Sequence, residues 1–230
     1  MQFVDSQTND KVVNFMYGVY GWMSVGLATT AGVAYAISTS PTLMKAIFTN
    51  SWITIGLFLF QIGLVVALSG FITKMNPATA SLLFLAYAAA MGVTLSSIFL
   101  VYSLPSIYAT FFVTAGMFGS MALYGYVTKA DLTQMGYIAG MAVWGLILAL
   151  LVNMFWKNSG FELVISAVGV IIFTLLTAYD TQKIKQIAQQ MIYSRQDVGG
   201  IAIIGALTLY LDFINMFLFL LRILGQREKE

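Results

Sequence analysis

Gly205-Ala-Leu-Thr-Leu-Tyr-Leu-Asp-Phe-Ile-Asn-Met-Phe-Leu-Phe-Leu-Leu221 is an apolar stretch long enough to cross a membrane, and it carries a carboxylate, Asp212, in its interior. A carboxylate near a bilayer centre costs on the order of 3 kcal/mol on insertion scales, so chains keep one there mainly for function. A second acid, Asp180, lies in Thr177-Ala-Tyr-Asp-Thr-Gln-Lys183, at the end of the preceding apolar run. Two acids on adjacent helices of a membrane protein indicate proton or cation chemistry.

Composition sets the class of protein. The 230 residues are 60% hydrophobic and 9% charged, and the mean hydropathy is +0.87. A soluble domain carries roughly 25% charged residues, so this chain predicts an integral membrane protein in contact with the lipid bilayer. The net charge of +2 is too small to favour a nucleic-acid partner.

The chain contains no Cys and no His. Their absence excludes disulfides, haem ligation, Cys or His nucleophiles and ordinary zinc sites. We expect no cofactor, and we expect no enzymatic activity. Any response to pH must come from carboxylates, because His is the side chain that normally titrates near neutral pH.

Charged residues separate apolar runs along the whole chain, and a spanning helix needs about 20 predominantly apolar residues. The interval from Lys74 to Lys129 is too long for one span and is broken by Ser103-Leu-Pro105, so it predicts two helices. The pattern predicts an all-α polytopic membrane protein. Its seven transmembrane helices are expected at residues 17–38, 52–72, 79–103, 106–127, 132–155, 162–182 and 201–222.

The connections between these runs are short, which predicts a single transmembrane domain at residues 17–224. A polar N-terminal tail, residues 1–16, precedes it, and a charged tail, residues 225–230, follows it. The first ten residues are polar and acidic, unlike a signal peptide, so we expect the first span to remain in the mature protein.

Orientation follows from Lys and Arg in short loops, which favour the cytoplasmic side. With the N-terminus inside, the inner loops hold Lys11, Lys74, Lys129, Lys183, Lys185 and Arg195, and the outer loops hold Lys45 and Lys157. The tail places Arg222, Arg227 and Lys229 outside, beside Glu228 and Glu230. The loops therefore predict a cytoplasmic N-terminus and a C-terminus on the outer side.

Other polar residues inside the spans have two interpretations. They could line a pore, or they could form hydrogen bonds between helices, which is the commoner role of such groups. The residues concerned are Gln61, Thr94, Ser96, Ser97, Asn153 and Asn215. The spacing of Gly136 and Gly140 is typical of close helix packing.

The two acids also have structural interpretations. Asp180 could pair with Lys183 at a wet helix end, and Asp212 could form a structural hydrogen bond. At about 1.5 Å per residue, Asp212 lies about 17 Å beyond Ile201, whereas Asp180 lies near the inner membrane surface. The sequence pattern leaves open whether the two acids meet.

Several segments together resemble the bacterial Bax inhibitor family, from Val19 to Gly225, and the resemblance is closest to its inner-membrane members. The pairing of Ala-Tyr-Asp-Thr-Gln-Lys with Tyr-Leu-Asp-Phe-Ile-Asn is the most specific part of it. The segments are Val19–Leu27, Thr94–Tyr102, Val113–Gly119, Leu123–Leu132, Thr177–Lys183 and Gly205–Asn215.

The resemblance implies a seven-helix fold with a central last helix, located in the inner membrane. It also implies a pH-sensitive calcium leak channel whose sensor is an aspartate pair on the sixth and seventh helices. The matching residues are Asp180 and Asp212, which would also ligate Ca²⁺ transiently, and Tyr179, Lys183 and Asn215 are candidate supporting groups. The second-helix arginine of some relatives has no counterpart, because residues 52–71 contain neither Arg nor Lys.

A carboxylate pair can act as a switch on physical grounds. Two carboxylates within hydrogen-bond reach in a low dielectric cannot both ionise easily, so they share one proton. The protonated pair would bridge its two helices. The deprotonated pair would repel and offer oxygen ligands suited to a hard cation such as Ca²⁺.

Three alternatives are open. In an intramembrane aspartyl protease, Tyr179-Asp180 would match the Tyr-Asp motif, but Leu209-Tyr-Leu-Asp212 lacks the second motif, Gly-x-Gly-Asp. A non-transporting regulator that binds membrane proteases or other membrane proteins would need only helix surfaces. A proton-coupled transporter of small metabolites is disfavoured, because no basic residue lies in the middle of a span to bind an anion.

Overall fold

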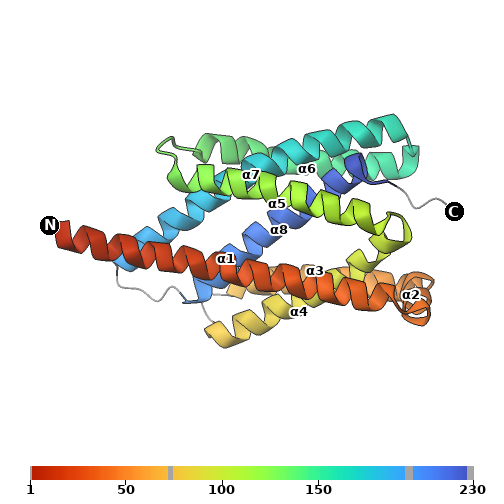
Figure 1. Cartoon of the computed structure of the whole chain (residues 1–230), viewed down its shortest axis with the longest axis horizontal. Coiled ribbons are helices and arrows are strands. Elements are labelled where there is room, and N and C mark those ends of the chain that lie inside the picture. The colour runs from red at the N-terminus through yellow and green to blue at the C-terminus, as the bar shows by residue number, and fades with distance from the viewer. Residues whose placement is uncertain (1, 72–74, 195–198, 227–230) are drawn as a thin grey trace. The chain divides into compact units, whose positions relative to one another are not determined.

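The computed structural model describes residues 2–71, 75–194 and 199–226, and these contain helices and no β-strand (Figure 1). The all-α prediction is confirmed. The helices are α1 (Gln2–Ser38), α2 (Pro41–Phe48), α3 (Ser51–Phe71), α4 (Pro77–Leu95), α5 (Leu104–Val127), α6 (Thr133–Trp156), α7 (Ser159–Tyr193) and α8 (Gly199–Leu224), and a 3₁₀ helix, η2 (Ser96–Leu100), follows α4.

Six helical segments of the described residues are long and apolar enough to cross a membrane. They are α3, α4 continued by η2, α5, α6, α7 and α8. Each overlaps one predicted span. The remaining predicted span, residues 17–38, lies within α1, which is not among the six, so the count of seven stays a prediction.

Two features near the N-terminus were not predicted. The described part of the polar tail is helical from Gln2 and continues into α1 without a break. The connection after α1 contains the short helix α2, which begins with Ser40 as its N-cap and Pro41 in its first turn. Both residue types are typical of helix starts, since Ser satisfies a free backbone N–H and Pro has none to satisfy.

Helix α7 is longer than predicted, because it ends at Tyr193 rather than near Gln182. The residues beyond Gln182 keep one buried face, with Ile184 and Ala188 inward and Lys183 outward. An amphipathic pattern of this kind continues a helix even where its composition becomes polar. Most of the connection expected between the spans at 162–182 and 201–222 is therefore helical, and residues 195–198 lie outside the described residues.

The chain divides into two compact units. The first comprises residues 1–101 and 188–210, and α1 and α4 are the helices in closest association within it. Its core contains Tyr210, which is fully buried. The Thr30 Oγ1 atom lies 2.6 Å from the Tyr210 hydroxyl oxygen and 2.8 Å from the Ala88 carbonyl oxygen, to which it donates. This network satisfies buried polar groups that would otherwise destabilise the unit.

The second unit comprises residues 102–187 and 211–230. Two glycines allow its helices to pack closely. A Cβ atom on Gly125 of α5 would collide with the Ala178 backbone of α7, and one on Gly136 of α6 would collide with the Tyr179 ring. The packing predicted for Gly136 is thus present, whereas Gly140 has no neighbour within 4 Å of such a Cβ atom.

Helix α8 is the most buried of the six membrane-length segments. Within its most apolar window 72% of the residues are buried, against 44% for α7 and 39% for the segment formed by α4 and η2. A helix that is apolar on all sides is expected to be enclosed by other helices. The predicted central position of the last helix agrees with this burial.

Candidate functional site: an aspartate pair

The carboxyl groups of Asp180 and Asp212 are hydrogen-bonded to each other, from α7 and α8 of the second unit. Asp212 is only 4% exposed, and Asp180 is half-buried. An ionised carboxylate only accepts hydrogen bonds, so a bond between two carboxyl groups requires a proton on one of them. The structure therefore brings the two predicted acids close enough to share one proton.

The interpretation of Asp180 as a helix-end residue is wrong. Helix α7 continues past Asp180 to Tyr193, so Asp180 lies in the helix interior. The neighbouring residues Thr177, Ala178 and Thr181 are fully buried. The geometric conflict between the acids disappears because α7 extends well beyond the end that its composition suggested.

Two side-chain oxygens, one on Asp212 itself and one on the residue that follows Asp180, have no conventional hydrogen-bond partner among the described residues. They are the Oδ2 atom of Asp212 and the Oγ1 atom of Thr181, and both are buried. Nearby, the Phe213 ring packs against Phe111 and Phe118 of α5, with ring centres 5.4 and 5.6 Å apart. Buried polar groups are almost always paired, so a buried carboxyl oxygen without a further partner favours a functional role for Asp212.

The candidate supporting residues lie around the pair but do not all contact it. The Lys183 Nζ atom lies 5.5 Å from the centre of the Tyr179 ring and also acts electrostatically on Asp180. The Asn215 amide instead donates to the Leu211 carbonyl oxygen of its own helix, at 2.8 Å. Asn215 therefore forms its hydrogen bond within α8 and not with the pair.

Two residues that hold α7 in place, Gln182 and Lys185, were not predicted from the sequence. The Gln182 side chain accepts a hydrogen bond from the Leu132 N–H at 3.0 Å and donates to the Ala130 carbonyl oxygen at 2.8 Å. The Lys185 ammonium donates to the Tyr126 carbonyl oxygen at 2.7 Å and lies 4.4 Å from the centre of the Tyr126 ring. Gln182 thus joins α7 to the connection between α5 and α6, and Lys185 joins it to the last turn of α5.

The spacing of these residues along the sequence could have indicated that they contact neighbouring helices. Ala178, Gln182 and Lys185 are separated by four and three residues, which places them on one helical face. Ala178 contacts α5 at Gly125, so the same face continues towards the end of α5 and the following turn. A cation near the last carbonyl groups of a helix is favourable, because it complements the helix dipole.

We predict that Gln182→Leu destabilises the protein by about 1–3 kcal/mol. The change leaves the Leu132 N–H and the Ala130 carbonyl without their partner in a partly buried turn, and unpaired buried groups cost this much. Thermal unfolding in detergent and hydrogen exchange at residues 128–132 would measure the effect. The matched control is Gln186→Leu, an exposed position on the same helix. Equal stability of the two variants would contradict the role of Gln182.

The other intramembrane polar residues have structural roles. The Gln61 amide of α3 donates to the Ala90 carbonyl oxygen at 2.9 Å and to the Thr94 hydroxyl at 2.6 Å. The Asn153 side chain accepts from the Asn158 N–H at 3.2 Å and closes the turn between α6 and α7. These contacts favour the interpretation that Gln61 and Asn153 stabilise packing rather than line a pore.

The donor set limits how a cation could be held. Among the described residues, no three His, Cys, Asp or Glu side chains gather in a way that could hold a metal ion. Ca²⁺ takes six to eight oxygen ligands, and two carboxylates offer at most four oxygens. Asp180 and Asp212 thus fit transient contact with a partly hydrated cation better than a closed metal site.

The sequence matches known proteins over nearly its whole length. The family described as Inhibitor of apoptosis-promoting Bax1 matches residues 12–229. The inner membrane protein YbhL of Escherichia coli strain K12 is 49% identical over 217 residues, covering 93% of this chain and 92% of its own. An uncharacterised protein of Borreliella burgdorferi is 48% identical, with 94% and 93% coverage, and one of Deinococcus radiodurans is 43% identical, with 96% and 94%.

Proposed function

The chain belongs to the Bax inhibitor family, and we propose that it is a pH-sensitive leak channel or transporter for Ca²⁺ or another cation, gated by Asp180 and Asp212. The observation that supports this proposal is the hydrogen bond between the two carboxyl groups, one of them almost fully buried. Buried acids with a coupled partner are concentrated at functional sites.

The switch would act through the contact between α7 and α8. While the pair holds its shared proton, the hydrogen bond joins the two helices. When the proton leaves, two negative charges remain, and unit charges about 4 Å apart repel by about 4 kcal/mol at an effective dielectric of about 20. A repulsion of this size is enough to shift a two-state equilibrium by roughly a thousandfold. Flux should therefore be low when the pair is protonated and rise as the pH is raised.

The ionised pair would then interact with the cation as oxygen ligands. The Asp212 Oδ2 atom, which has no partner among the described residues, is available for this contact. Carboxylate oxygens suit hard cations such as Ca²⁺. Because only two acids contribute, the ion would keep part of its water and leave again, as conduction requires.

We propose that this chain lies in the inner membrane, as its relative in Escherichia coli, an inner membrane protein, does. The orientation with a cytoplasmic N-terminus and an outer C-terminus remains the prediction made from the basic loop residues. An enzymatic activity forms no part of the proposal. A regulator that binds other membrane proteins without transport is the competing function.

Purified protein in liposomes that contain no other protein tests the proposal. Calcium entry, followed with a trapped fluorescent indicator, should increase with pH from about 5 to 8 and be absent from empty liposomes. Flux that is absent at every pH in correctly folded protein would favour the regulator. Flux that does not vary with pH would remove the gating role of the acids.

We predict that Gln61→Ala and Asn153→Ala lower stability and leave the pH profile of flux unchanged. Gln61 loses two hydrogen bonds to α4, and a typical net loss is about 0.5–1.5 kcal/mol for each bond. Thermal unfolding and flux should be measured on the same preparation. If either change abolished flux in folded protein, the ion pathway would lie at that residue instead of at the acids.

A further inference from the structure

A groove lies on the second unit between α6 and α7, at the end where α5 is followed by α6. Its volume is about 400 Å³, within the range of roughly 300–1,000 Å³ that is usual for ligand sites. The lining residues are Asp131, Gln134, Met135, Ile138, Ala139, Ala142, Ile172 and Leu175. None of these residues was assigned a role in the proposed switch.

The lining is polar at one end and apolar along the rest. Asp131 and Gln134 lie at the start of α6, both exposed, and every other lining residue is apolar. Along α6 the apolar part extends to Ala142, which is about 12 Å beyond Gln134 at about 1.5 Å per residue. One leaflet of a bilayer has a hydrocarbon depth of about 15 Å, half of the roughly 30 Å core. The groove thus has the polarity and the length of a lipid with its headgroup at the interface.

The only charge in the lining is the carboxylate of Asp131. Its side chain accepts a hydrogen bond from the Thr133 N–H at 2.9 Å. The side-chain and backbone hydrogen bonds with Thr133 lower the pKa of Asp131, so the group is negatively charged at neutral pH. The Asp131 carboxylate and the amide oxygen of Gln134 can both accept hydrogen bonds, so together they favour a cationic lipid headgroup that donates them.

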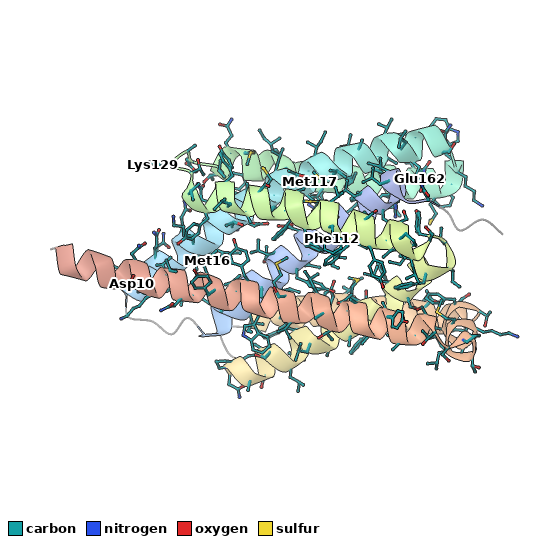
Figure 2. All side chains as sticks on the ribbon, viewed as in Figure 1. Asp10, Met16, Phe112, Met117, Lys129 and Glu162 are labelled. Carbon is teal, nitrogen blue, oxygen red and sulfur yellow. The ribbon has the colours of Figure 1, made fainter. Side chains whose placement is uncertain are left out.

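A basic residue, Lys129, lies close in sequence to the polar end of the groove. Lys129 is exposed and precedes Asp131 by two residues in the same turn. Figure 2 shows Lys129 at this end of the second unit and Glu162 at the opposite end, where α7 begins. A zwitterionic headgroup carries both a phosphate and an amine, and Lys129 and Asp131 offer one partner for each.

We propose that this groove binds a phospholipid with a primary-amine headgroup, of the phosphatidylethanolamine class. One acyl chain lies along Ile138, Ala142 and Leu175. The ammonium group is held by Asp131 and Gln134, and the phosphate group faces Lys129. A primary ammonium donates three hydrogen bonds, whereas a trimethylated ammonium donates none, so the site distinguishes ethanolamine from choline headgroups.

Native mass spectrometry of the purified protein in an equimolar mixture of phosphatidylethanolamine, phosphatidylcholine and phosphatidylglycerol tests the proposal. The wild type should retain phosphatidylethanolamine in preference to the other two lipids. Asp131→Asn keeps the acceptor for Thr133 and removes the charge, so it should lower that retention roughly three- to tenfold. Asp10→Asn, an exposed acid of the first unit, is the matched control and should change nothing.

A second variant tests the apolar part of the groove. Ala142→Phe fills the groove from a half-buried position and should reduce retention of all three lipids to a similar extent. Equal retention of the ethanolamine and choline lipids by the wild type would overturn the proposal. Preference for phosphatidylglycerol would also overturn it, since Lys129 alone would then explain binding. If Ala142→Phe changed only the oligomeric state, the groove would hold a helix of a second copy.

Discussion

Asp212→Asn is expected to abolish the pH dependence of cation flux and to hold flux at its low-pH level throughout. Asn is uncharged at every accessible pH and its amide can donate to Asp180, so it replaces the shared proton permanently. The two carboxyl groups are hydrogen-bonded in the wild type, and the substitution keeps that contact without the titration. Calcium entry into liposomes between about pH 5 and 8 measures the effect.

The partner acid provides the decisive comparison. Asp180→Asn should give the same flat profile, because removing either carboxylate removes the repulsion between the two charges. The double variant should resemble either single one, since residues that act as a unit are not additive. If Asp180→Asn keeps the wild-type pH profile of flux while Asp212→Asn loses it, then Asp212 titrates alone. The hypothesis that the two acids share a proton would then be wrong.

Gly125→Ala should produce the second large effect, a destabilisation of about 2–3 kcal/mol together with an altered pH profile. The new Cβ atom would collide with the Ala178 backbone of α7, which cannot move aside as a flexible side chain can. Overpacking of this kind typically costs 1–3 kcal/mol. Ala178 precedes Asp180 by two residues, so separating α5 from α7 also displaces the acid. Thermal unfolding and liposome flux measure the two parts.

Gly119→Ala, on the same helix, is the matched control. No atom lies within 4 Å of a Cβ atom built on Gly119. Alanine has a higher helix propensity than glycine by about 1 kcal/mol, so this variant should be neutral or more stable. A similar loss of stability in both variants would show that the close contact at Gly125 is unimportant.

The apolar runs were sufficient to locate six helices, because membrane length and hydropathy are local properties of the chain. The end of α7 was misjudged for a related reason. Gln182, Lys183 and Lys185 resemble a polar helix end, whereas in the folded chain Gln182 pairs with the connection after α5 and Lys185 with the last turn of α5. From the sequence alone, a polar side chain predicts exposure to solvent. In the folded chain the same side chain can be buried, because a hydrogen-bond partner satisfies it.

The sequence by itself determined the membrane class, the identity of the two acids and the burial of Asp212, because these follow from composition and from the residues on either side. Only the tertiary structure decided that Asp180 and Asp212 meet. Their contact depends on how far α7 extends and on the register between α7 and α8. Gly125 and Gly136 allow α5 and α6 to pack closely on α7 beside Asp180, and Gly169 of α7 allows a close approach of the Phe219 ring of α8. Contacts between distant segments leave no trace in local periodicity.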